Sequence, residues 1–147
     1  VYKRQVKGGI SWVQGIYYPL YFASLYGRGE SLQLKIDCPK YSTDIADDVK
    51  YIDASGVLNN EDNELSFFII NRSEKDNINI NFNLKDIHID NIIDQQIINN
   101  EDMYAANTKD KPKTIQPQKS SIAQLINNQL SANLPCLTYL FVRLKLK

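Results

Sequence analysis

Polar and apolar residues alternate without a break in one stretch of the chain, Asn77-Ile78-Asn79-Ile80-Asn81-Phe82-Asn83-Leu84. Successive side chains of a β-strand point to opposite faces of the sheet, so the apolar residues of this stretch share one face and the asparagines share the other. The sequence therefore predicts a strand with one face buried and one face in solvent.

The segments on either side also have strand patterns. Residues 65–71 are apolar at successive positions, which predicts a central strand that is covered on both faces. The polar turn 72–76 connects this segment to the alternating stretch, and the segment 51–58 precedes it. We expect the three segments to form a meander of neighbouring strands.

Further strands are predicted in the second half of the chain. Asn127-Asn128 suits a two-residue hairpin loop, because asparagine tolerates a positive φ angle. The last strand places Leu140, Val142, Leu144 and Leu146 on one face. The additional strand segments are 87–98, 122–126, 130–134 and 138–146. About seven or eight short strands with turns between them predict an antiparallel β-sandwich, so the fold class is mainly β.

The periodicity is helical only near the start of the chain. Apolar residues recur at helical spacing between Ile16 and Leu25, and Gly27 suits the position that ends a helix. We expect one short helix here. The segment from Asn99 to Gln118 contains Pro112 and Pro117 and has no regular pattern, which predicts a long loop wrapped over one sheet.

Composition excludes several classes of protein. The 147 residues fit about one domain and are too few for a (β/α)₈ barrel, which needs about 250. The chain has 17 Lys and Arg against 17 Asp and Glu, and this balance argues against nucleic acid or a membrane as partner. A single histidine and two distant cysteines exclude a structural zinc site, and we expect no metal ligands in the chain. We expect Cys38 and Cys136 to be free thiols, with a disulfide between them as the alternative.

Several motifs together resemble the end of the catalytic barrel and the C-terminal domain of α-L-arabinofuranosidases of glycoside hydrolase family 51. The resemblance covers nearly the whole chain from Trp12, and the motifs follow the family's order. They are Trp12 to Pro19, Ala23 to Gly29, Pro39-Lys40-Tyr41, Asp48 to Ser55, Asn71-Arg72, Asn107-Thr108, Leu134-Pro135 and Arg143-Leu144.

The resemblance implies three parts. Residues 1–9 are an unmatched leader, residues 10–29 are the last loop and helix of a catalytic barrel, and residues 30–147 are a C-terminal β-sandwich. It also implies retaining hydrolysis of terminal α-L-arabinofuranosides in arabinan or arabinoxylan oligosaccharides, which needs two carboxyl groups and no cofactor. Both family glutamates lie upstream of residue 1, so we expect no catalytic residue in this chain and no hydrolysis by it alone.

By resemblance, Gln14 matches a glutamine that hydrogen-bonds the sugar, and Trp12 matches an aromatic residue of the same loop. The structural alternatives are a polar residue at a helix start for Gln14 and a core aromatic for Trp12. The pairs Asn60-Glu61 and Asn100-Glu101 superficially match the family's acid/base motif. Both lie in turn-rich segments where nothing would desolvate a glutamate, so we expect neither to be catalytic.

The resemblance further implies a bacterial cytoplasmic enzyme that binds arabinofuranosyl oligosaccharides through the missing barrel and forms a homo-oligomer. The aromatic residues of the helix then pack at the interface between barrel and sandwich. The alternative is a free-standing β-sandwich that binds carbohydrate without cleaving it. Such modules expose several aromatic residues on one strand surface, whereas the predicted strands here expose Asn, Asp and Lys.

Overall fold

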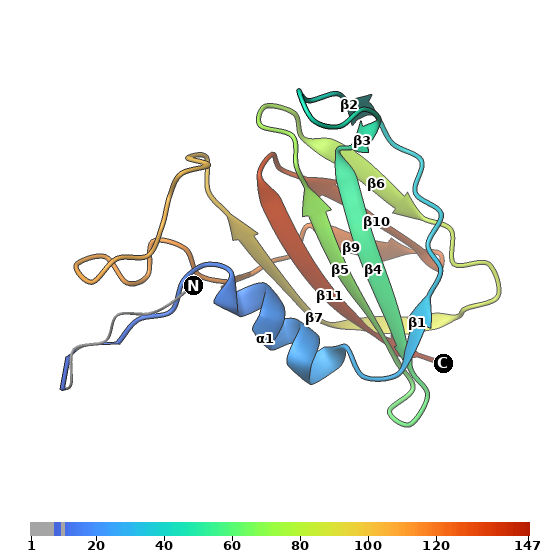
Figure 1. Ribbon diagram of the computed structural model, residues 1–147. Helices are drawn as coiled ribbons and strands as arrows, with labels where there is room; N and C mark the ends of the chain where they lie inside the picture. The colour runs from blue at the N-terminus through green and yellow to red at the C-terminus, as the bar shows by residue number, and fades with distance from the viewer. Residues whose placement is uncertain (1–7, 10) are drawn as a thin grey trace.

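The computed structural model describes residues 8, 9 and 11–147. These residues form an antiparallel β-sandwich with one helix against its outer face (Figure 1). The predicted leader, residues 1–9, lies outside the described residues except for Gly8 and Gly9. In chain order the described elements are α1 (Tyr17–Tyr26), β1 (Glu30–Leu32), β2 (Lys40–Tyr41), β3 (Val49–Lys50), β4 (Ile52–Asn59), β5 (Glu64–Asn71), β6 (Ile78–Phe82), β7 (Ile89–Asn99), β8 (Gln118–Lys119), β9 (Ala123–Ile126), β10 (Gln129–Leu134) and β11 (Thr138–Leu146).

Two sheets make up the sandwich. The larger has the strand order β1-β4-β5-β11-β7-β8, and the smaller has the order β6-β10-β9. Every pair of neighbouring strands is antiparallel. A separate two-stranded ribbon, β2-β3, lies at one end. The predicted fold class is therefore confirmed, and the strands that the sequence pattern missed have only two or three residues each.

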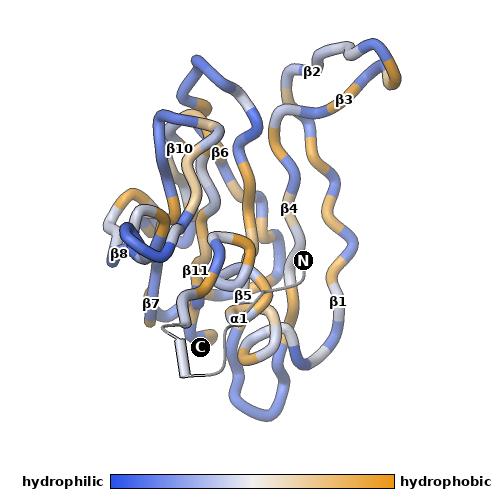
Figure 2. The backbone as a smooth tube through the Cα atoms, turned by 60° about the vertical axis from the view of Figure 1, so that its left-hand side comes forward, coloured by the Kyte–Doolittle hydropathy of each residue, from blue (hydrophilic) through white to orange (hydrophobic). Residues whose placement is uncertain are grey.

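The core lies between the two sheets. The fully buried apolar side chains come mainly from β5, β10 and β11, and each stabilises the fold by roughly 1.5–3 kcal/mol. As predicted, Leu140, Val142, Leu144 and Leu146 share the inner face of β11. Figure 2 shows hydrophobic stretches along the central strands and hydrophilic residues in the turn between β4 and β5.

The alternating stretch forms β6 as predicted. Ile78, Ile80 and Phe82 pack against the core, while Asn79 and Asn81 are exposed. The two-residue hairpin is also confirmed, because Asn127 and Asn128 have φ angles of 51° and 61° between β9 and β10.

The predicted three-strand meander is wrong in its third strand. β4 and β5 are neighbours, but β6 belongs to the smaller sheet, and β11 occupies the other edge of β5. The turn 72–76 therefore carries the chain from one sheet to the other. Buried Asn71 fixes this crossing: its Nδ2 donates to the carbonyls of Asp76, Leu134 and Pro135 at 2.9–3.1 Å.

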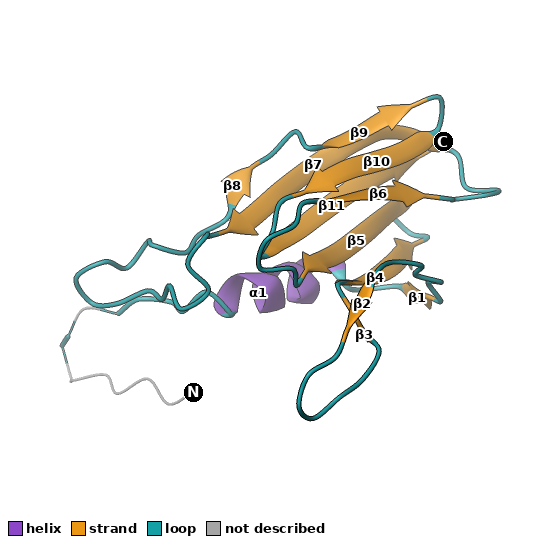
Figure 3. Cartoon of the chain, turned by 90° about the horizontal axis from the view of Figure 1, so that it is seen from above, coloured by secondary structure: helices purple, strands orange, loops and turns teal. Residues whose placement is uncertain are grey.

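Helix α1 packs on the outer face of the larger sheet, beneath it in the view of Figure 3. The ring of Phe22 is buried and stacks on Phe141 with 4.8 Å between centroids, and Tyr26 stacks on Phe141 at 5.1 Å. The helix ends at Gly27 as predicted, where a Cβ would lie 2.5 Å from the carbonyl oxygen of Ala23. A helix of 10 residues is marginal alone, so this packing holds it in place.

The opposite face of α1 is apolar and exposed. Ile16 and Leu20 are 63% and 65% exposed, and Tyr17, Tyr21 and Leu25 are each more than 40% exposed. A contiguous apolar surface on one helix face marks a surface that packs against another structure.

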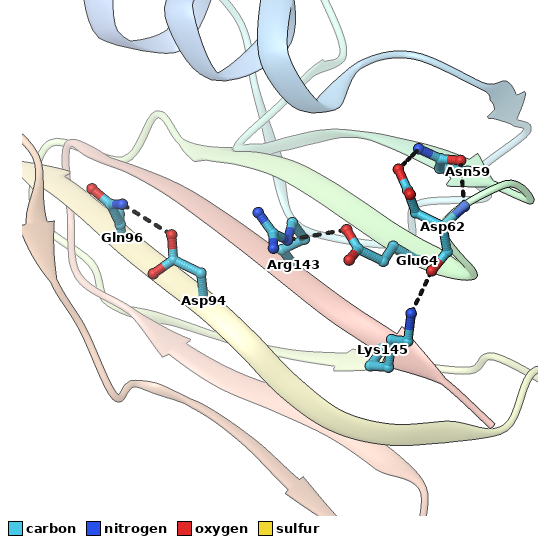
Figure 4. Close-up of polar contacts among 7 residues, drawn as sticks. All are labelled: Asn59, Asp62, Glu64, Asp94, Gln96, Arg143 and Lys145. Carbon is cyan, nitrogen blue, oxygen red and sulfur yellow. Dashed lines mark hydrogen bonds and ion pairs between the residues drawn. The ribbon is translucent and has the colours of Figure 1, made fainter.

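Beside the helix, the outer face of the larger sheet is polar (Figure 4). Arg143 Nε forms an ion pair with Glu64 Oε2 at 3.1 Å, and the guanidinium also lies 4.7 Å above the ring of Tyr26. Lys145 donates to the carbonyl of Asp62 on the same face. The two faces of β11 therefore differ: one completes the core, and the other holds the helix.

Both cysteines are free, as predicted.

Candidate functional site

Two segments far apart in the sequence meet at one end of the larger sheet. The segment Trp12 to Gly15 precedes α1, and residues 100–117 form the loop between β7 and β8. This loop was predicted to wrap over one sheet, and that prediction is wrong. Figures 1 and 3 show that it extends past the end of β7, where it hydrogen-bonds the segment before α1.

The backbone carbonyl of Asn107 holds both sequence-predicted site residues. It accepts hydrogen bonds from Trp12 Nε1 at 3.1 Å and from Gln14 Nε2 at 3.0 Å. Residues 12 and 14 therefore direct their side chains toward the same atom. The structure brings Trp12 and Gln14 together, as expected if they serve one site.

The side chain of Asn107 completes the connection. Its Nδ2 donates to the carbonyls of Val13 and Ile115, both at 2.8 Å, and its Oδ1 accepts from the Ile115 amide at 2.7 Å. The residue is only 2% exposed. We call Trp12, Val13, Gln14, Asn107 and Ile115 the Asn107 clamp.

Gly15 allows the two segments to approach. A Cβ at this position would lie 2.8 Å from Cγ2 of Ile115, closer than real Cβ contacts. Immediately after it, the Tyr17 amide donates to the Gln14 carbonyl at 2.9 Å and begins the first turn of the helix. The clamp is thus continuous with α1, which Phe22 anchors to the sheet.

The Asn107 clamp leaves one polar group of Gln14 unused. Trp12 and Gln14 are half-buried, and Gln14 Oε1 accepts no hydrogen bond from the described residues. A primary amide both donates and accepts, so this oxygen suits a sugar hydroxyl. The half-buried indole can present its face to a sugar ring.

None of the described carboxylates is buried, and the candidates singled out in the sequence are exposed. Glu61 and Glu101 are both in solvent, and no Asp or Glu is buried in the part of the chain that the structure describes. Asp53 and Asp48 form surface ion pairs with Arg72 and Lys40. Acid catalysis needs a carboxyl group with a raised pKa, which requires burial or a close like charge. None of these four carboxylates has a buried setting.

The described residues contain no group of three or more His, Cys, Asp or Glu that could hold a metal ion. None of the helices among them is long and apolar enough to cross a membrane.

Sequence reasoning assigned no role to Asn107, although Asn107-Thr108 is one of the motifs in the resemblance. Sequence periodicity cannot reveal the role of Asn107, because Trp12, Val13 and Gln14 lie 93 to 95 residues away from it. The one usable signal is the long irregular loop that carries it.

Comparison with known proteins identifies the family of the chain. The chain is 34% identical over 139 residues to the intracellular exo-α-(1→5)-L-arabinofuranosidase 1 of Bacillus subtilis, an alignment that covers 95% of this chain and 27% of that protein. It is 32% identical over 138 residues to the intracellular exo-α-(1→5)-L-arabinofuranosidase of Halalkalibacterium halodurans, covering 94% of this chain and 27% of that protein. The chain thus spans about a quarter of the length of these relatives.

A solved structure has the same fold. The family 51 α-L-arabinofuranosidase of Bifidobacterium longum superposes with a TM-score of 0.86 at 23% identity, covering 95% of this chain and 27% of that one. The profile of the α-L-arabinofuranosidase C-terminal domain family matches residues 4–137. The chain belongs to this family of glycoside hydrolase C-terminal domains.

Proposed function

We propose that this chain is the C-terminal part of an enzyme that releases terminal α-L-arabinofuranosyl groups from arabinan or arabinoxylan oligosaccharides with retention of configuration. Its membership in the family supports this, as do relatives that are named arabinofuranosidases along nearly its whole length. The activity would belong to a longer protein, of which this chain supplies about a quarter.

The catalytic carboxyl groups would lie in the rest of that protein. Retaining hydrolysis needs two carboxyl groups about 5–5.5 Å apart, one to attack the anomeric carbon and one to protonate the leaving oxygen. The exposed carboxylates described above are unsuited to both roles. We therefore propose that the chain alone hydrolyses nothing and that the reaction needs no cofactor.

Residues 10–29 would be the last loop and helix of the catalytic barrel, and residues 30–147 would be the C-terminal β-sandwich. The exposed apolar face of α1 supports this division, since it is ready to pack against another domain. The other face of α1 already packs on the sandwich. The helix would then join the two domains.

The contact between this chain and the sugar would be made by Gln14 and Trp12. One observation carries this proposal: a single carbonyl oxygen holds both side chains, and the amide oxygen of Gln14 stays available for a sugar hydroxyl. We propose hydrogen bonding by Gln14 and stacking by Trp12.

The names of the relatives favour an intracellular location, and we propose the same for this protein. We also propose a homo-oligomer for the whole enzyme. A free-standing carbohydrate-binding module is less favoured, because its usual row of exposed aromatic residues is missing from the described strands. A hollow of about 350 Å³ beside β6 has four asparagines among its eight lining residues.

A chimera tests the proposed function. The part of the Bacillus subtilis relative that precedes its match to this chain is joined to this chain, and hydrolysis of p-nitrophenyl α-L-arabinofuranoside is measured. We expect an active chimera and an inactive isolated chain. Gln14→Ala should lower kcat/KM about ten-fold, as for the loss of one neutral hydrogen bond. A chimera that folds, as judged by cooperative melting, and hydrolyses nothing would contradict the proposal.

A further inference from the structure

We propose that Asn107 is a positioning residue, through which the β-sandwich fixes Gln14 and Trp12 for sugar binding. This inference rests on the proposed function. It gives the loop between β7 and β8 a role in the active site, although none of its residues needs to touch the substrate.

The first argument is geometric. Asn107 contacts three consecutive residues of the segment before α1: the side chain of Trp12, the backbone carbonyl of Val13 and the side chain of Gln14, all at 2.8–3.1 Å. Hydrogen bonds at these lengths are direction-dependent and weaken steeply when bent. Together they fix the position of the segment and the rotamers of both side chains.

The second argument concerns entropy. A free glutamine side chain loses rotamer entropy when it is immobilised. The bond from Gln14 Nε2 to the Asn107 carbonyl restricts this side chain before any sugar arrives. Sugar binding then loses less side-chain entropy, which is the benefit of preorganisation.

The third argument is that the clamp itself is rigid. Asn107 is 2% exposed, and its own amide is held by two bonds to the backbone of Ile115 across the loop. The side-chain amide of Asn107 therefore anchors the part of the loop whose backbone carbonyl accepts from Trp12 and Gln14. Removing the Asn107 side chain would loosen the acceptor of Trp12 and Gln14 while leaving both of those residues in place.

Trp12 is the only tryptophan, so its fluorescence reports on the clamp directly in the 147-residue chain. We expect Asn107→Ala to shift the Trp12 emission to the red and to increase its quenching by acrylamide, because the backbone carbonyl that accepts from the indole is no longer held by the side chain of residue 107. Asn107→Asp should also shift the emission to the red and increase the quenching. Aspartate keeps the size of the side chain but lacks the two N–H groups of Nδ2. Asn100→Ala is the matched control: Asn100 lies in the same loop and bonds only locally to the Asp102 amide. It should leave the emission unchanged.

The enzymatic test uses the chimera and a double-mutant cycle. We expect Asn107→Ala to lower kcat/KM by about 10- to 100-fold, the range expected for a misplaced binding group. It should show the same division between KM and kcat as Gln14→Ala. In the Gln14→Ala background, Asn107→Ala should lower kcat/KM by a clearly smaller factor than in the wild-type background, because only Trp12 is left to be misplaced.

The outcomes separate this inference from the proposed function. An active chimera in which the Asn107 and Gln14 substitutions have multiplicative effects would overturn the positioning role and leave the proposed function intact. An unchanged Trp12 emission in both folded Asn107 variants would also overturn it. Should Asn107→Ala fail to fold, Asn107→Asp carries both measurements. Trp12→Phe, which keeps an aromatic ring and removes the donor, carries the kinetic measurement alone.

Discussion

The inter-sheet core and the Asn107 clamp both join distant parts of the chain, but by different means. The core is made of fully buried apolar side chains of neighbouring strands. The clamp is made of five hydrogen bonds around one buried asparagine. Apolar burial is non-directional and mainly stabilises, whereas a hydrogen-bond network fixes orientation. The difference indicates that the core maintains the fold and that the clamp places particular side chains.

The core should give the largest effect on stability. Phe67 is fully buried and lies 4.7 Å from the ring of Phe82 in the facing sheet. We expect Phe67→Ala to lower the free energy of unfolding by about 4 kcal/mol, measured by urea denaturation. Below the transition the Trp12 emission should stay unchanged. Phe68→Ala, on the outer face of the same strand, should cost clearly less, and equal losses would show that the core is not where the structure places it.

The contact between α1 and the larger sheet should give the second-largest effect on stability. Phe22 is 3% exposed and stacks on Phe141, so Phe22→Ala should cost about 3 kcal/mol and reduce the helical circular dichroism signal. Leu20→Ala removes a similar side chain from the exposed face and should change stability by about 0.5 kcal/mol or less. A Leu20 variant as unstable as the Phe22 variant would mean that the exposed face is covered in the isolated chain.

The clamp should show a smaller cost in stability and a larger change in geometry. Gly15→Ala places a methyl group against Ile115, and we expect a loss of about 1 kcal/mol together with a red shift of the Trp12 emission. Adding Ile115→Ala should make room for the methyl group and restore the emission. No shift in the single variant would contradict the close approach of the two segments.

The smallest effect on stability is expected for Tyr139, on the face of β11 toward the helix. The hydroxyl of Tyr139 is buried without a partner among the described residues, and burial raises the pKa of this phenol. Tyr139→Phe should therefore be neutral or stabilise by about 1 kcal/mol. Because the folded-state pKa is the higher one, the wild type should lose stability as pH rises above about 10, and the variant should lose less. Marked destabilisation by Tyr139→Phe at neutral pH would show that the hydroxyl has a partner.

The sequence predicts the regions that depend on local pattern. The alternation of β6, the apolar β11 and the two asparagines of the hairpin each specify their structure within a few residues. Local pattern could not show that the turn after Asn71 crosses to the other sheet, because Asn71 is bound by carbonyls more than 60 residues away. The same limit hid the role of Asn107. A buried polar residue whose partners are distant in the sequence belongs to no periodic pattern that would reveal it.

The site was predicted only in part for a related reason. Resemblance identified Gln14 and Trp12, and the structure shows that they converge on one acceptor. The loop that supplies this acceptor was expected over a sheet. Its position depends on Gly15 and Ile115, whose contact is visible only in three dimensions.

A crystal structure of the chimera with L-arabinose bound is the most direct test of the central claim, that this chain contacts the sugar through Gln14 and Trp12. We expect the Gln14 amide within about 3 Å of a sugar hydroxyl and the bonds from Trp12 and Gln14 to Asn107 intact. A sugar bound entirely by residues of the other domain, with Gln14 turned away from it, would contradict the account.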